Sequence, residues 1–573
     1  MIDEKRSIPA PPTQGLFLGK LDEESVYPFP EQDPDEKEIA DMTVAAFREW
    51  ADDNLDSEKI DRDQEIPESV RRQLGELGLL GATVPEEYEG AGFGTTSYCR
   101  LVEEMCRRDA SLSVFVGAHL SIGAKPLLLY GNPEQKARYL PGVATGRTLC
   151  AFALTEPGSG SDANAMRTTA EWDEAKGVFR INGNKIWITN GSYADLFSVF
   201  AKTRGSRGEG PGAFLVRRGQ PGFTNGPSEH KLGIRGTATT ELAFQDVEVA
   251  PEDVIGEIGE GFKIALETLE TGRLSLGAGC TGGSKECLKM AVEHATERTQ
   301  FRKTIISFGM IREKLARMAA HTYGSESAVY LTSGLIDRDR RTLPVEAGFC
   351  KVLGSETLWE AVNDTVQVVG GIGYMDEYPY QRYLRDARIN LIFEGTNEIL
   401  RLSGTLEALK EPSHRVTAQL KAEKAGLGAE GLEQAMGAIA GQPATVPGWV
   451  PGVLAAEGEC FAAALTGFSA KVVDVLRRHR RRILGQQYTL RRLADGAIQL
   501  YAMLAVLSRV STRVAAVGEE RSARDILLAR RFIEEAAVRV RHEVEAIETP
   551  RDAFDDQLAE LLGEEGRYPA PLF

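Results

Sequence analysis

Residues 179–191, which read FRINGNKIWITNG, decide the fold class of this chain. Two short runs of alternating polar and apolar residues flank Asn182-Gly183, a pair that favours the turn between antiparallel strands. We therefore predict a β-hairpin at this position. Further strand-like runs follow at 196–201, 213–216 and 240–244. Together they predict a β domain over residues 149–255.

Helical periodicity lies on both sides of this β domain. Val70, Leu74 and Leu77 repeat at intervals of four and three and are followed by Gly78, which predicts a helix that ends there. Glycine, alanine and proline are frequent between 411 and 455, as in a linker. We predict an α+β fold with these parts: an N-terminal arm (1–34), a helical domain (35–148), a barrel-like β domain (149–255), a helical-bundle domain (256–410), a linker (411–455) and a C-terminal helical domain (456–573).

Length and charge narrow the class of protein. A chain of 573 residues is too long for one hydrophobic core. Its net charge of −17 argues against nucleic acid as the main partner, because phosphate binding needs a basic face. No unbroken apolar run approaches the roughly 18 residues of a membrane span, and the N-terminus lacks an apolar signal, so we expect a cytoplasmic protein. The seven cysteines include no CxxC pair, and we expect no metal site.

Three segments could contact a ligand, and each has a structural alternative. In 154–162 (LTEPGSGSD) small residues leave backbone N–H groups free for a polar ligand, or simply form a solvated loop. Trp187 and Thr189 lie two apart on a strand and could line a flat ring, although a strand tryptophan is more often core. The glycines of 367–374 (QVVGGIGY) suit a helix end or a close backbone approach to a ligand.

The segment 392–400 (IFEGTNEIL) carries the candidate general base, Glu394. A mostly apolar run, 389–393, delivers this carboxylate, Gly395 breaks the element, and Thr396 or Asn397 can cap the next helix. A carboxylate among apolar neighbours should have a raised pKa, as a general base requires. The alternative is a surface glutamate at the joint between two helices.

Together and in this order, these four segments resemble the acyl-CoA dehydrogenase family, and more specifically its very-long-chain branch. The resemblance runs almost end to end, from Gly15-Leu16-Phe17 and 27–30 (YPFP) to 571–573 (PLF). The tail segment 492–503 resembles the longer, dimeric branch. Gly309 stands where shorter members have a glutamine, and Gln487 matches the tail glutamine of the long-chain members. A homodimer is therefore implied.

The resemblance also implies that FAD binds between the β domain and the third domain. The residues implied for the flavin ring and ribityl chain are Phe152, Leu154, Thr155, Gly160, Ser161, Trp187, Ile188 and Thr189, with Gln487 reaching the flavin from the tail. Those implied for the rest of the cofactor are Arg298, Phe301, Gln367, Val368, Gly370, Gly371, Thr396, Asn397 and Glu398. An arginine fork and a helix N-terminus are both good phosphate partners. The alternative for Arg298 is an ion pair with Glu293 or Glu297.

For the reaction, the resemblance implies that Glu394 removes the α-proton of an acyl-CoA while the β-hydride passes to the flavin. Electrons would then pass to an electron-transfer flavoprotein. The residues implied for the substrate are Ser161, Glu270, Thr271, Gly272, Arg273, Phe393 and Gly395. Gly117 and Ala118 are small where shorter-chain members have bulkier groups near Val114 and Ala118, which favours a long acyl chain.

Several alternatives stay open at this point. An acyl-CoA oxidase would use the same base with oxygen as acceptor, and a dehydrogenase fold can also serve as an assembly scaffold. The acyl group could be branched or aromatic. Arg477, Arg478, Arg481 and Arg482 could dock on anionic lipid or form a solvated face. The membrane-contact segment of long-chain relatives maps to 425–451, which is poor in Lys and Arg here, so a membrane surface is a doubtful partner.

Overall fold

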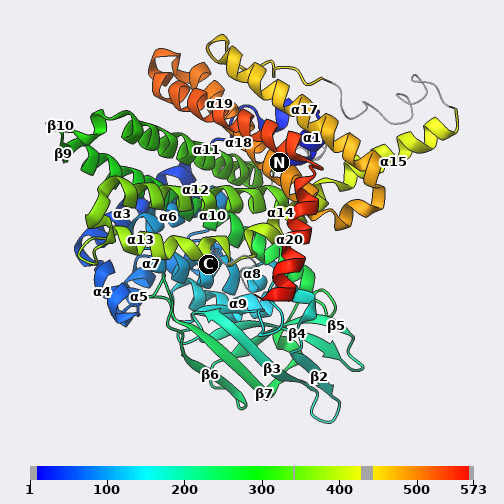
Figure 1. The fold of residues 1–573 in the computed structure, drawn as a ribbon. Coiled ribbons are helices and arrows are strands. Elements are labelled where there is room, and N and C mark those ends of the chain that lie inside the picture. The colour runs from blue at the N-terminus through cyan, green and yellow to red at the C-terminus, as the bar shows by residue number, and fades with distance from the viewer. Residues whose placement is uncertain (1–9, 340–341, 427–442, 567–573) are drawn as a thin grey trace. The chain divides into compact units, whose positions relative to one another are not determined.

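The computed structural model describes residues 10–339, 342–426 and 443–566 (Figure 1). The chain divides into two compact units. The larger unit is Phe29–Ile399, and the smaller one combines Met1–Pro28 with Leu400–Phe573.

The larger unit begins with short and medium helices. They are α3 (Pro34–Asn54), α4 (Ser57–Asp63), α5 (Glu68–Glu76), α6 (Thr95–Arg108), α7 (Ala110–Gly117), the π-helix η3 (Ala118–Gly123), α8 (Lys125–Tyr130) and α9 (Pro133–Ala144). As predicted, the α5 region stops at Gly78, which has a left-handed φ of 75°. Asn132 and Gln135 form a capping box at the start of α9.

A mixed eight-stranded sheet follows, in the order β6-β7-β3-β2-β4-β5-β8, with β1 parallel to β4 (Figure 1). Its strands are β1 (Cys150–Ala153), β2 (Thr169–Asp173), β3 (Val178–Thr189), β4 (Leu196–Arg204), β5 (Gly210–Arg217), β6 (Phe223–Ser228), β7 (Thr239–Val249) and β8 (Val254–Ile255). Phe197 and Val199 of β4 pack in the sheet's own core, whereas Phe200 packs with the N-terminal helices. Burial on both faces explains why residues 196–201 of this strand are apolar except for Ser198.

The predicted hairpin at Asn182-Gly183 is wrong, although the β domain itself is confirmed. β3 runs unbroken through both residues, with a register shift against β7 between Ile181 and Gly183. A Cβ on Gly183 would lie 2.5 Å from Thr168 Oγ1, so this glycine permits a close approach of the chain. The β2–β3 turn lies earlier, where Gly177 has a φ of 67°.

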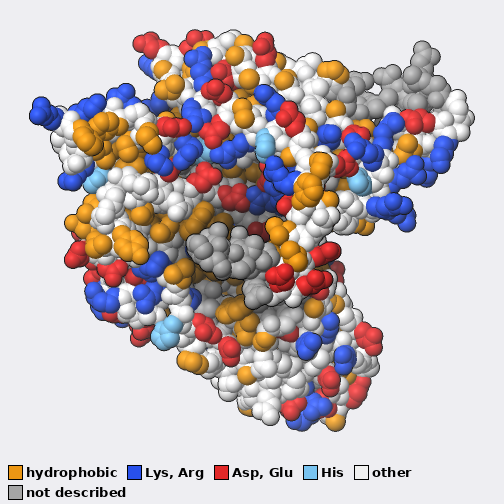
Figure 2. All heavy atoms as spheres, viewed as in Figure 1, with side chains coloured by type: hydrophobic (Ala, Val, Ile, Leu, Met, Phe, Trp, Pro, Cys, Tyr) orange, Lys and Arg blue, Asp and Glu red, His pale blue; other side chains and the backbone are white. Residues whose placement is uncertain are grey.

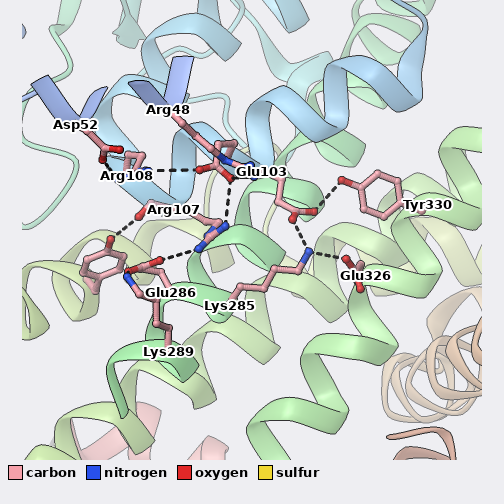
Figure 3. Close-up of polar contacts among 12 residues, drawn as sticks. Arg48, Asp52, Glu103, Arg107, Arg108, Lys285, Glu286, Lys289, Glu326 and Tyr330 are labelled. Atoms are coloured by element: carbon pink, nitrogen blue, oxygen red, sulfur yellow. Dashed lines mark hydrogen bonds and ion pairs between the residues drawn. The ribbon is translucent and has the colours of Figure 1, made fainter. Parts of the chain in front are cut away.

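Long helices complete the larger unit: α10 (Gly261–Glu297), α11 (Gly309–Asp339), α12 (Pro344–Val369) and α13 (Tyr380–Ala387), with a hairpin of β9 (Thr299–Gln300) and β10 (Lys303–Thr304). A Cβ on Gly282 would lie 2.0 Å from the Glu103 carbonyl oxygen, so α10 and α6 cross closely. Polar side chains join the same helices (Figure 3): Lys285 of α10 binds Glu103 of α6 and Glu326 of α11, and Tyr330 donates to Glu103 at 2.8 Å.

The smaller unit is helical, with α1 (Pro12–Leu18), α2 (Glu23–Val26), most of α14 (Asn397–Ala408), α15 (Lys410–Lys424), α17 (Ala455–His479), α18 (Gln487–Val517), α19 (Ala523–Ala546) and α20 (Arg551–Glu565). The arm packs on the tail through Phe17 and Phe468, whose ring centroids are 5.2 Å apart. α15 corrects the first part of the predicted linker: Pro412 lies in its first turn, where proline is tolerated. Residues 427–442 of that linker and the closing 571–573 lie outside the described residues.

Among the described residues, two helical stretches are long and apolar enough to cross a membrane by length and composition, Ala110–Tyr130 and Gln487–Val517. Both are mostly buried inside the protein, at 67% and 61% of the most apolar window. Core helices of this kind pass the same test, so the finding by itself is weak support for a membrane span.

Candidate active site

Glu394 lies in the short connection between η8 (Arg388–Leu391) and α14. It has a left-handed φ of 59°, followed by 92° at Gly395, and a non-glycine residue holds such a conformation only when its surroundings fix it. Oε2 of Glu394 is buried and has no hydrogen-bond partner among the described residues. Burial raises the pKa of this carboxyl, and the cations of Arg273 and Lys351 oppose that rise. The raised pKa agrees with the prediction and argues against a plain surface glutamate.

The carboxylate of Glu394 points toward α10. A Cβ added to Gly272 would lie 2.9 Å from Glu394 Oε2 and 3.0 Å from Ile122 Cγ2. Only a glycine leaves this space to the carboxylate without displacing a neighbour. The next residue, Arg273, donates from Nε to the Glu394 carbonyl oxygen at 3.2 Å. The structure therefore brings Gly272, Arg273 and Gly395 of the predicted substrate set to the predicted base, Glu394.

The rest of this loop is held on α12. Lys351 donates to the Gly395 carbonyl oxygen at 2.9 Å and to Asn397 Oδ1 at 2.8 Å. Thr396 accepts from Ile399 N–H at 3.2 Å and so caps α14, one of the two caps that we predict. Lys351 was not among the residues predicted from the sequence. A single lysine within the apolar run of α12 is the signal that could have revealed it.

The other predicted substrate residues are less closely joined to Glu394. Glu270 is buried, accepts from the Leu343 N–H, and has its pKa raised to about 7, chiefly by burial. Thr271 and Phe393 are half-buried next to Gly272 and Glu394 in the chain. Ser161 is exposed in the loop after β1, and no hydrogen bond among the described residues links it to Glu394.

The β domain offers a face suited to a flat ring. Trp187 is 65% exposed and has a φ of 55°, which argues against the interpretation of this tryptophan as core filler. The predicted contacts Phe152, Leu154, Thr155 and Thr189 are half-buried, and Gly160 and Ser161 are exposed. Ile188 is 2% exposed and packs in the sheet core, so only its backbone is placed to contact a ligand.

A second predicted cofactor group lies at the β9–β10 end of the unit, away from the sheet (Figure 1). Phe301 is 87% exposed, and Figure 2 shows hydrophobic side chains gathered beside Lys and Arg side chains at this end. Arg298 is exposed, and within the described chain it forms no ion pair with Glu293 or Glu297. Gln367, Gly370 and Gly371 are exposed, and a Cβ on either glycine would meet open space, whereas the Val368 side chain is buried.

These observations fit FAD, which needs an aromatic platform, open glycine backbone and unpaired cations for its phosphates. Glu398 is exposed on α14, beside the capping Thr396. Gln487 belongs to the smaller unit, where it is the exposed first residue of α18. In the part of the chain that the structure describes, no group of three His, Cys, Asp or Glu side chains could hold a metal ion.

Comparison with known proteins decides the family. Models of the acyl-CoA dehydrogenase N-terminal, middle and C-terminal domains match residues 37–147, 151–247 and 259–405. The C-terminal domain named ACAD9/ACADV matches 453–562. The very long-chain specific acyl-CoA dehydrogenase of human mitochondria is 39% identical over 93% of this chain and 84% of that protein. The chain belongs to the acyl-CoA dehydrogenase family.

Other relatives of this acyl-CoA dehydrogenase agree. A probable acyl-CoA dehydrogenase of Bacillus subtilis is 38% identical over 82% of this chain and 80% of its own length. The crystal structure of the Bacillus anthracis acyl-CoA dehydrogenase complexed with FAD superposes with a TM-score of 0.81, at 32% identity, over 97% of this chain and 96% of that one. The predicted fold, enzyme class and FAD cofactor are thereby confirmed.

Proposed function

We propose that this dehydrogenase oxidises long- or very-long-chain acyl-CoA to trans-2-enoyl-CoA in fatty acid β-oxidation and passes the electrons to an electron-transfer flavoprotein. The observation that supports it most is the Glu394 carboxylate, buried and unpartnered at Oε2 beside Gly272. The resemblance to very-long-chain members extends through the tail, where the ACAD9/ACADV domain matches.

Two groups of Glu394 would act on the substrate: its carboxylate on the α-carbon and its backbone N–H on the thioester oxygen. Ionised Glu394 takes the α-proton, and its raised pKa makes it a stronger base than an exposed glutamate. The Glu394 N–H donates no hydrogen bond within the described chain, so it is free to bind the thioester oxygen. One such donor contributes about 3 kcal/mol in a transition state. When bound, FAD supplies the electron acceptor for the oxidation.

Space near Gly117 supports a long acyl chain. A Cβ on Gly117 would meet only Ser121 Oγ, at 3.8 Å, so the helix surface there is open. Ala118, one residue further, is small and buried. A bulky side chain at Gly117 would fill the space that we assign to the far part of the acyl chain.

Flavin bleaching by a series from butyryl-CoA to eicosanoyl-CoA tests this substrate class. We expect the fastest reduction with chains of palmitoyl length or longer. Gly117→Leu should reduce the rate with palmitoyl-CoA at least about 10-fold while leaving butyryl-CoA nearly unchanged, because a blocked pocket rejects only the longer chain. Equal losses for both substrates, or a wild-type preference for butyryl-CoA, would refute the long-chain assignment.

The electron acceptor is decided by a second assay. With palmitoyl-CoA as reductant, we expect electron-transfer flavoprotein to be reduced under anaerobic conditions, and hydrogen peroxide in air to form at under about one tenth of that rate. Peroxide formation as fast as acyl-CoA consumption would instead identify an acyl-CoA oxidase. A protein that binds FAD but oxidises no acyl-CoA would favour the scaffold alternative.

We propose a homodimer, and the separation of the two predicted cofactor groups supports it. Trp187 lies on the sheet and Phe301 on the distant β9–β10 hairpin, yet the resemblance implies that both contact FAD (Figure 1). We propose that a second copy brings its hairpin to the first copy's sheet. The exposure of Phe301 supports this arrangement, because a large apolar side chain gains most from being covered.

The location of the protein stays a prediction: cytoplasmic, with a peripheral contact at the inner membrane face as an option. Arg477 pairs with Glu423, and Arg478 pairs with Asp474 and Glu548. Such pairing favours the solvated-face interpretation of this helix over lipid docking. Arg481 and Arg482 are exposed.

A further inference from the structure

Lys351 of α12 is one of the largest fully buried side chains of the molecule, at 0% exposure. A buried ammonium is unfavourable unless its environment replaces water. Within the described residues, no carboxylate lies within ion-pair distance of Lys351. Its partners are instead two neutral oxygens of the loop that carries Glu394, the Gly395 carbonyl and Asn397 Oδ1. Lys351 therefore binds the loop that carries Glu394, and it does so through neutral oxygens instead of a carboxylate.

These two bonds fix the loop immediately after Glu394. Asn397 is itself held on α12, since its Nδ2 lies 3.1 Å from Ser355 Oγ and 3.1 Å from Glu356 Oε1. On the other side of the loop, Arg273 of α10 binds the Glu394 carbonyl oxygen. The left-handed backbone at Glu394 is thus held from two helices, as a strained residue requires.

The charge of Lys351 also acts on the Glu394 carboxylate. The cations that face Glu394 are Arg273 of α10 and Lys351 of α12, and both lower its pKa against the effect of burial. Lys351 in turn faces Cys280 and Arg273 of α10, Glu394 of the loop and Glu356 of its own helix. Burial lowers the pKa of Lys351 to about 8, so the ammonium is charged in neutral solution.

We propose that Lys351 is a positioning residue for the base: it holds the loop on α12 so that the Glu394 carboxylate points at Gly272, and it supplies a positive charge beside that carboxylate. This inference rests on the proposed function of Glu394. It goes beyond that function because Lys351, which lies outside the motif around Glu394, would help to set both the position and the proton affinity of the base.

The test compares Lys351→Met with Lys351→Arg in the FAD-loaded enzyme, using single-turnover flavin reduction by palmitoyl-CoA across pH. Lys351→Met should keep its flavin, lose at least about 10-fold in limiting rate, and change the apparent Kd for substrate less than about 3-fold. In the profile of reduction rate against pH, the acidic limb of Lys351→Met should shift to higher pH by about one pH unit, because a cation that favours ionised Glu394 has been removed. Lys351→Arg should keep the wild-type limb and recover part of the rate.

Lys285→Met is the matched control, because it removes a half-buried lysine of the same unit that is likewise held by side chains of neighbouring helices, Glu103 and Glu326 (Figure 3). We expect it to lower the melting temperature without moving the acidic limb. Asn397→Ala, which keeps the Lys351 charge and removes one loop contact, should slow reduction with the limb unchanged. This variant keeps the proposal testable if Lys351→Met does not fold.

Three results would overturn the proposal. One is a Lys351→Met enzyme with wild-type rate and limb, and another is a limb displaced equally by Lys285→Met. The third is an Asn397→Ala enzyme with the wild-type rate. A wild-type enzyme whose flavin no acyl-CoA reduces is a different outcome, because it refutes the proposed function itself.

Discussion

Glu394→Gln should retain yellow, bound flavin and reduce it at least about 10²-fold more slowly than wild type, as expected when a general base is lost. Glutamine matches glutamate in size, so the fit against Gly272 and Ile122 is preserved. Its amide cannot take up the α-proton. The buried Oε2 of Glu394 has no other partner in the described chain, so no local hydrogen-bond network should collapse.

Stopped-flow bleaching with palmitoyl-CoA measures this loss, and the flavin-to-protein absorbance ratio shows that the cofactor is retained. Glu293→Gln, an exposed carboxylate of α10, is the matched control and should react like wild type. If the flavin of Glu394→Gln were reduced at the wild-type rate, Glu394 could not be the base. The proton would then have to pass to another group.

The fold class could be predicted because it depends on local periodicity. Local patterns do not, however, reveal contacts between residues that are distant in the sequence. Asn182-Gly183 has the composition of a turn, but Thr168 packs against Gly183 and β3 continues. The helix α15 was included in the predicted linker because the composition of 411–455 was averaged over the whole stretch, although Pro412 lies in the first turn of α15, where proline is tolerated. In both cases the local structure depends on a feature outside the short segment: the neighbour Thr168 for Gly183, and the start of the helix for Pro412.

For the candidate site, too, the sequence predicts local properties but not contacts between distant segments. The apolar run before Glu394 predicts a raised pKa, and the structure agrees. Motifs name residues but not the atoms that face a ligand, and so Ile188 and Val368 were included although their side chains lie in the core. Lys351 could not be paired with Gly395 from sequence, because α12 and the loop meet only in the folded chain.

A second residue that the sequence analysis passed over is Lys185, which joins the two segments predicted to hold the flavin ring. Lys185 of β3 is 0% exposed and donates to Glu156 Oε1 at 2.7 Å and to the Leu154 carbonyl oxygen at 3.0 Å. Glu156 is 5% exposed and also accepts from the N–H groups of Arg167 and Thr168. The hydrogen bonds to Glu156, together with the burial of the pair, tie the loop after β1 to β3.

Lys185→Met should therefore destabilise the protein by about 3–5 kcal/mol, because it leaves the Glu156 carboxylate buried without a cation. FAD should also bind more weakly, since the loop and Trp187 would no longer be held together. Chemical denaturation and flavin titration measure the two effects.

Two comparisons separate this mechanism from a general loss of packing. Adding Glu156→Gln to Lys185→Met should recover part of the stability, because a neutral amide still accepts from Arg167 and Thr168 without leaving a buried charge. Lys176→Met, which removes the exposed Lys176–Glu248 pair of the same domain, should have a much smaller effect. If Lys185→Met were no more harmful than Lys176→Met, the buried pair would not be what holds the two flavin segments together.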